Sequence, residues 1–215
     1  MNLKRVVITG LGTINPLGHN VPEFWDNLIK GVSGAGPITR FDASKFRTQF
    51  ACEVKNYDPT VYFDRKEVRK MDLYTQFGLI AAREAIQDSG LNLEAEDKKR
   101  IGVIWGAGIG GLQTFFEECN DFSKGDGTPR FNPFFIPKMI ANMCGGMIAI
   151  EHGLKGPNYT TVSACASSAH AMVDALNLIR LGKADVIVSG GSEAAVTVPG
   201  VGGFNAMKAI STRND

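Results

Sequence analysis

Thr160–Ala171, TTVSACASSAHA, is the stretch that decides the fold of this chain. A β-branched run passes directly into small residues and then into a long helical pattern, which predicts a strand over Asn158–Ser163 and a helix over Ala164–Leu181. Cys165 falls at the strand-to-helix turn. A helix N-terminus carries unpaired N–H groups and a partial positive charge, which favour a thiolate and can hold an oxyanion. Cys165 is therefore the candidate nucleophile, against the alternative of a small cysteine buried for packing.

Outward from this turn, strands alternate with helices along the chain. Apolar runs predict four more strands, and a shorter run gives a weaker indication of another. Helical periodicity, with prolines at the starts and glycines at the ends, predicts five more helices. The strands are Arg5–Gly10, Ile101–Trp105, Asp185–Ser189 and Ala195–Val198, with the shorter signal over Phe50–Val54. The helices are Pro22–Gly31, Lys66–Ser89, Leu112–Phe122, Ile136–His152 and a short one from Phe204. Strands separated by helices predict an α/β sheet, mixed or parallel, covered on both faces.

Composition excludes several classes of function. The 215 residues have a net charge of +1, so no global basic field drives nucleic-acid binding. No apolar run approaches a membrane span, and the short apolar start is not a signal peptide, so we expect a cytoplasmic protein. The four cysteines form no CxxC pair and no metal site, so we expect free thiols, with Cys52, Cys119 and Cys144 packed in the interior.

Gly106–Gly111, GAGIGG, follows a predicted strand and precedes a predicted helix, as a dinucleotide-binding turn does. The Rossmann unit requires a second strand ending in an acidic residue about twenty positions later. A polar loop, Phe122–Phe135, stands there instead. The sequence therefore does not favour a nucleotide site.

The three histidines are interpreted as structural. His170 follows Cys165 by five positions, which turns its side chain roughly 140° around the helix from the thiol. His152 lies in the last turn of a predicted helix, where its side chain suits free carbonyl groups, and His19 lies in a loop. None is expected to act on Cys165.

Arg65–Asp72, RKEVRKMD, gathers four basic side chains around one glutamate at the start of the longest predicted helix. From residues alone, such a cluster is by default a solvated helix face. A docking surface for an acidic partner is the alternative.

The chain resembles the elongating β-ketoacyl-acyl-carrier-protein synthases, type II. The resemblance is carried by four motifs in order, RKEVRKMD, IWGAGIGGL, SACASSAH and GVGGFNAMKAISTRND, together with VVITGLGTINPLG near the start. The resemblance implies the thiolase fold, a duplicated α/β core of layered helices and sheets. Residues 1–215 correspond to its N-terminal domain. Cys165 matches the cysteine that accepts the acyl chain before a decarboxylating condensation with malonyl-carrier protein. In the family, two histidines and a lysine of the second half complete the site, and no residues here match them.

The resemblance also assigns further residues. Ile109 and Phe204 match acyl-pocket positions, with core packing as the alternative. Phosphopantetheine arrives on the acyl carrier protein, so no cofactor or metal is expected. Homodimers are the rule, with the strand before the cysteine pairing across the twofold axis. A polyketide-type ketosynthase and a non-catalytic partner subunit remain alternatives, although such subunits replace the cysteine. Carrier-docking positions match Lys66, Arg69, Lys70, Arg130 and Lys208; Arg213 stays open between docking and a structural role.

Overall fold

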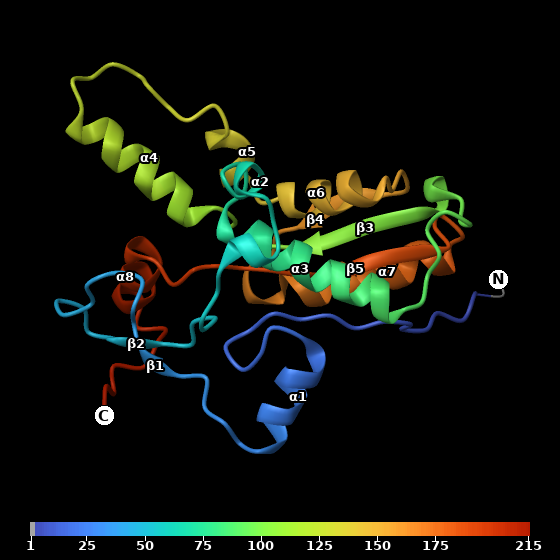
Figure 1. The fold of residues 1–215 in the computed structure, drawn as a ribbon, viewed down its shortest axis with the longest axis horizontal. Helices are drawn as coiled ribbons and strands as arrows, with labels where there is room; N and C mark the ends of the chain where they lie inside the picture. Colours follow the sequence, from blue (N-terminus) through green and yellow to red (C-terminus); the bar gives the residue numbers. More distant parts are fainter. Residues whose placement is uncertain (1–2) are drawn as a thin grey trace.

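The computed structural model describes residues 3–215, and a three-stranded parallel sheet lies at its centre (Figure 1). Strand β3 (Ile101–Gly106) lies between β4 (Asn158–Thr161) and β5 (Val186–Gly191). In the register of the sheet, Trp105 lies opposite Thr160 on one side and Gly190 on the other. All of β3 is buried, as its continuous apolar sequence predicts for a strand covered on both faces. These three predicted strands are confirmed.

Helices cover the sheet on both faces, which makes an α/β fold (Figure 1). Helices α3 (Leu73–Asp88) and α6 (Met143–His152) pack together on one face. Helix α7 (Ser167–Arg180) packs on the other face, against all three strands.

The remaining elements surround this core. An arm projects from the body and consists of α4 (Leu112–Lys124), the loop after it and α5 (Phe135–Met139) (Figure 1). At one end of the molecule lie α8 (Val198–Ala206) and the two short strands β1 (Gly36–Pro37) and β2 (Phe50–Ala51), which pair antiparallel (Figure 1). The other elements are α1 (Val21–Ile29), α2 (Arg65–Val68), and 3-10 turns at Pro59–Val61, Lys98–Arg100 and Ala164–Ala166.

The strand predicted over Arg5–Gly10 is not formed. The segment is unpaired among the described residues, and Val7 and Ile8 are 57% and 81% exposed. The chain that follows is held along α3: Leu11 N–H donates to Asp88 Oδ2 at 2.8 Å, and Thr13 N–H donates to Glu84 Oε2 at 2.8 Å. A strand needs a neighbouring strand for its backbone groups, and residues 3–215 supply none here.

The strand predicted over Ala195–Val198 is also wrong. Thr197 is the N-cap of α8, and its hydroxyl accepts a hydrogen bond from Gly200 N–H at 3.1 Å. Pro199 in the first turn suits a helix start, so the helix predicted from Phe204 begins instead at Val198.

The helix predicted over Lys66–Ser89 is two helices, α2 and α3. The buried Asp72 carboxylate caps α3, accepting from Tyr74 N–H at 3.3 Å, and also accepts from the Thr114 hydroxyl at 2.6 Å. An aspartate that reaches these donors takes the extended N-cap conformation, which interrupts the helix.

The helix predicted over Ile136–His152 is likewise divided into α5 and α6. The Tyr74 hydroxyl donates to the Ile140 carbonyl oxygen at 2.6 Å, between the two helices. That bond gives the carbonyl a partner outside any helix. The break therefore depends on a contact from α3, which the local sequence does not contain.

The cysteines are all free, as predicted, but of the three expected in the interior only Cys144 is buried. Cys52 and Cys119 are exposed. Cys119 lies on the projecting α4, and Cys52 follows the short edge strand β2, so neither has a core around it. Burial raises the pKa of the Cys144 thiol to about 12, which keeps that thiol protonated at neutral pH.

No helix within residues 3–215 is long and apolar enough to span a bilayer. Within the same range, no group of three or more His, Cys, Asp or Glu side chains is placed to bind a metal ion.

Candidate active site

Cys165 is exposed on a 3-10 turn, Ala164–Ala166, between β4 and α7. Ala164, directly before it, has a φ of +52°, a left-handed conformation that is unfavourable for a residue with a Cβ. Such conformations gather at functional sites, where surrounding contacts hold them. The sharp turn presents the thiol at the surface and leads directly into the helix.

Ser167 holds this turn from its inner side. It is 4% exposed, and its hydroxyl accepts from Ser163 N–H at 2.9 Å and donates to the Ala164 carbonyl oxygen at 2.7 Å. The Thr161 hydroxyl in turn donates to the Ser167 carbonyl oxygen at 2.7 Å. The residues on both sides of Cys165 are thus fixed by hydrogen bonds.

A glycine at the end of β3 lets α7 begin this close to the sheet. A Cβ added at Gly106 would lie 2.5 Å from Ser167 C and 2.5 Å from Ser168 N, closer than real Cβ atoms come. The backbone of the first turn of α7 therefore rests directly on β3. The position of Cys165 depends on this contact.

The histidines have other partners. His170 Nδ1 lies 2.6 Å from Ser163 Oγ, beside the turn. His19 lies 3.0 Å from the Tyr62 hydroxyl and 2.8 Å from the Lys55 carbonyl oxygen. His152 is partly buried beside Glu151, and burial lowers its pKa. The structural interpretation of the three histidines stays a prediction, and His152 Nε2 is buried without a hydrogen-bond partner among the described residues.

The glycine-rich turn after β3 already holds an anion of the chain itself. The Glu193 carboxylate accepts from Gly108 N–H at 3.0 Å, from Ile109 N–H at 2.7 Å and from Gly110 N–H at 3.2 Å. Backbone N–H groups that could hold a phosphate are thus occupied, which agrees with the interpretation against a nucleotide site. Glu193 was not predicted from the sequence, where its only signal is an acidic residue shortly after the glycines that end β5 (Val186–Gly191).

Ile109 and Phe204 lie on different elements. Ile109, on the turn after β3, is 43% exposed, and Phe204 is partly buried in α8. A Cβ added at Gly108, the neighbour of Ile109, would lie 3.4 Å from the Ala164 carbonyl oxygen. The Ile109 turn therefore lies next to the Cys165 turn.

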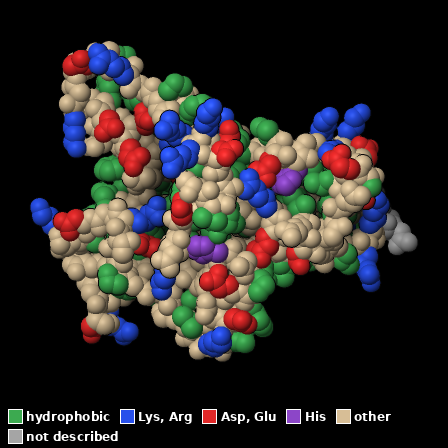
Figure 2. Space-filling view, viewed as in Figure 1, with side chains coloured by type: hydrophobic (Ala, Val, Ile, Leu, Met, Phe, Trp, Pro, Cys, Tyr) green, Lys and Arg blue, Asp and Glu red, His purple; other side chains and the backbone are tan. Residues whose placement is uncertain are grey.

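The predicted docking residues are brought together only in part. Lys66 lies in α2, and Arg69 and Lys70 follow its end. Figure 2 shows Lys and Arg side chains gathered on this face of the molecule. Lys70 also pairs with Glu67 at 2.7 Å. Arg130 lies on the projecting loop between α4 and α5, and Lys208 follows α8. Arg213 is exposed near the end of the chain, 4.0 Å from Asp215.

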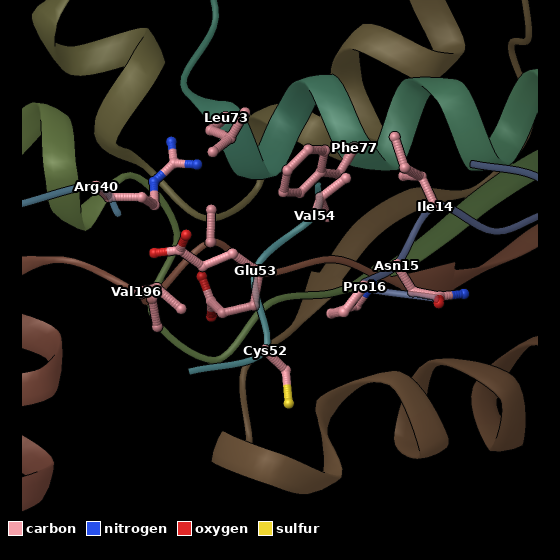
Figure 3. Close-up of a pocket in the computed structure, with 13 residues that line it drawn as sticks. Ile14, Asn15, Pro16, Arg40, Cys52, Glu53, Val54, Leu73, Phe77 and Val196 are labelled. Carbon is pink, nitrogen blue, oxygen red and sulfur yellow. The ribbon is translucent and has the colours of Figure 1, made fainter. Parts of the chain in front are cut away.

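A cavity of about 160 Å³ lies beside Glu193, the residue that holds the glycine-rich turn (Figure 3). Its lining includes Glu193, Glu53, Arg40 and the exposed Cys52. Burial raises the pKa of Glu193, while the N–H groups of the glycine turn lower it by a smaller amount.

The α/β fold of this chain has counterparts of known structure. An ishigamide ketosynthase/chain length factor superposes with a TM-score of 0.88 at 29% identity, over 98% of this chain and 52% of that one. A ketosynthase solved in complex with a type II PKS acyl-carrier protein superposes with a TM-score of 0.80 at 20% identity, over 94% and 54%. The fold is thiolase-like, as predicted.

The family follows from the sequence match. Residues 3–215 match the β-ketoacyl synthase family, described as "Beta-ketoacyl synthase, N-terminal domain", and the chain belongs to that family. It is 46% identical to the 3-oxoacyl-[acyl-carrier-protein] synthase 2 of Coxiella burnetii over the whole of this chain. The chain spans 52% of that relative's length.

Proposed function

We propose that this chain is the acyl-accepting N-terminal domain of a 3-oxoacyl-acyl-carrier-protein synthase of fatty-acid elongation, working in the cytoplasm. The exposed Cys165 on its strained turn is the observation that carries the proposal. The relationship to a 3-oxoacyl-acyl-carrier-protein synthase 2 supports the substrate class.

In the proposed first step, the Cys165 thiolate attacks the carbonyl carbon of an acyl-carrier thioester. A new carbon–sulfur bond forms to Cys165, the bond to the phosphopantetheine sulfur breaks, and the carrier leaves as a thiolate that takes up a proton. The Cys165 N–H, at the helix start, is the proposed donor to the developing oxyanion.

In the proposed second step, malonyl-carrier protein loses carbon dioxide. The resulting enolate carbon attacks the acyl–Cys165 carbonyl, the 3-oxoacyl product leaves on the carrier, and the thiolate is restored. As the resemblance implies, two histidines and a lysine outside residues 1–215 would stabilise the enolate and the oxyanion. No cofactor of the protein's own takes part.

The test is mass mapping of the full-length protein after incubation with an acyl-carrier thioester. We expect the acyl group on Cys165 alone, and no acylation in Cys165→Ala. Cys119→Ala is the matched control, because Cys119 is also free and exposed. Acyl label on Cys119, or label that persists in Cys165→Ala, would contradict the assignment.

We also propose that the α2 basic cluster, Lys66, Arg69 and Lys70, docks the acidic carrier, with Arg130 and Lys208 on neighbouring surfaces. The solved complex of a related fold with its acyl-carrier protein supports a carrier as partner. Charge reversal at Arg69 should weaken the use of carrier-bound substrate, most at low salt, and spare carrier-free thioesters. Lys155→Glu, on the exposed loop before β4, is the control. Equal losses with both substrates would assign Arg69 to the fold instead.

A homodimer is the proposed assembly, with β4 as the pairing strand. β4 is an outer strand of the sheet, and within residues 3–215 only β3 is hydrogen-bonded to it. An unpaired edge of this kind is a template for a second strand.

A further inference from the structure

One partly buried carboxylate, that of Glu193, organises the turn that carries Ile109. It accepts hydrogen bonds from three consecutive backbone N–H groups, those of Gly108, Ile109 and Gly110, at 2.7 to 3.2 Å. Gly110 has a φ of +85°, so the turn curls its N–H groups around one centre. The side chain of Glu193 therefore fixes the backbone on both sides of Ile109.

This turn lies next to the Cys165 turn. A Cβ placed on Gly108 would lie 3.3 Å from Glu193 Oε2 and 3.4 Å from the Ala164 carbonyl oxygen. The Glu193 carboxylate thus holds a turn that lies next to Ala164, the residue before Cys165. A shift of the Ile109 turn changes the surface beside the thiol.

Stability alone does not account for a carboxylate at this position. Burial raises the pKa of Glu193 despite the hydrogen bonds, so folding penalises its ionised form. A group with a raised pKa adds stability below its ordinary pKa and loses it as the pH rises through the raised value. Folding therefore disfavours the ionised carboxylate here, and perturbed carboxyl groups of this kind gather at functional sites.

We propose that Glu193 is a positioning residue that holds Ile109 beside the Cys165 turn and thereby sets which acyl chains Cys165 accepts. The inference rests on the proposed function, because it gives Glu193 a part in acyl selection only if Cys165 accepts acyl groups. Glu193 itself touches the backbone of the turn and needs no contact with the substrate. Its effect passes through the position of Ile109.

The test compares two variants and a control in the full-length protein. Glu193→Gln keeps the size of the side chain but sets an amide N–H₂ against a backbone N–H, and Glu193→Asp shortens the reach. Glu53→Gln is the matched control, since Glu53 lines the same cavity but accepts from the Thr39 hydroxyl at 2.6 Å. The measurements are the rates of Cys165 acylation by long and short acyl-carrier thioesters, alkylation of Cys165 by iodoacetamide, and amide exchange at residues 108–110.

In Glu193→Gln we expect the ratio of long-chain to short-chain acylation to change by about fivefold or more, as for the loss of a hydrogen bond to a charged group. Amide exchange at 108–110 should become faster, alkylation should stay unchanged, Glu193→Asp should be intermediate, and Glu53→Gln should behave as wild type.

Three results would overturn the proposal. An unchanged chain-length ratio in both variants removes Glu193 from acyl selection, while acylation of the wild-type Cys165 leaves the proposed function standing. A uniform loss for all chains together with slower alkylation assigns Glu193 to the fold. Rapid amide exchange at 108–110 in the wild-type protein would show that the hydrogen bonds are absent, and this result needs no variant to fold. A wild-type Cys165 that accepts no acyl group at all defeats the proposed function first.

Discussion

The Cys165 turn and the segment Leu3–Gly10 differ in whether the contacts that would hold them lie within the described residues. The turn is held by hydrogen bonds of Ser167 and by the contact of α7 on Gly106, all within the described residues. Leu3–Gly10 has the sequence of a buried strand, yet it is unpaired among those residues and Ile8 is 81% exposed. A local geometry forms from local contacts, whereas a strand also needs a partner.

The largest expected effect is at the Cys165 turn. Gly106→Ala places a Cβ 2.5 Å from backbone atoms of Ser167 and Ser168, which can give way only if α7 moves. We expect a loss of about 3 kcal/mol in the free energy of unfolding and slower acylation of Cys165. Thermal unfolding and mass mapping of the full-length protein measure both.

Gly146→Ala is the control for this change. Gly146 lies inside α6 with nothing within 4 Å of an added Cβ, so alanine should stabilise the helix by about 0.5–1 kcal/mol. If Gly106→Ala were as well tolerated as Gly146→Ala, the turn would not depend on this contact.

The same contrast explains what the sequence could and could not predict. The strands β3, β4 and β5, the helix α7 and the turn of Cys165 follow from β-branched runs, small residues and glycine stops. The breaks between α2 and α3 and between α5 and α6 depend on Asp72 and on the Tyr74 hydroxyl, which reach partners far along the chain. Side chains that bond over such separations leave no periodic signal.

The site shows the same division. Cys165 was predictable because its strand and helix adjoin it in sequence. Glu193 was not, because its three N–H partners lie more than eighty positions earlier and only the fold brings them together. Cys52 and Cys119 were wrongly expected to be buried, since a cysteine's general preference for the interior says nothing about a particular edge strand or projecting helix.

The second prediction addresses the other region. The chain spans 52% of the length of its Coxiella burnetii relative, and we propose that a segment matching the rest of that relative covers Leu3–Gly10. We then expect Ile8→Ser to cost about 2 kcal/mol in the full-length protein, because Ile8 would be buried. Amide exchange over residues 6–9 should show protection in the same protein. Thermal unfolding measures the first effect.

Val61→Ser is the control, since Val61 is 75% exposed in a 3-10 turn and has no strand pattern around it. A negligible loss for Ile8→Ser, with unprotected amides, would mean that the apolar run stays exposed. The exposure of Leu3–Gly10 would then follow from the sequence of the segment and not from a missing partner strand.

The smallest expected effect concerns the ion pairs at the start of this segment. Asp185 accepts from Arg100 Nε at 2.9 Å and from Lys4 Nζ at 3.2 Å, and these bonds, that of Arg100 first, hold the pKa of the Asp185 carboxyl below its ordinary 3.8. A lowered carboxyl pKa adds stability above the ordinary value, and this stability is lost as the pH falls through the lowered one. We therefore expect Asp185→Asn to lower the unfolding temperature slightly at neutral pH and progressively less below 3.8.

Solvent and salt keep this effect small, because the Asp185 side chain is half exposed. Glu94→Gln is the control: Glu94 also pairs with a lysine, Lys98, at 2.8 Å, but it has no link to Leu3–Gly10. Only Asp185→Asn should speed amide exchange near Lys4. An undiminished destabilisation at acid pH would show that Asp185 acts through packing, and equal exchange in the two variants would show that the Lys4 bond does not hold the segment.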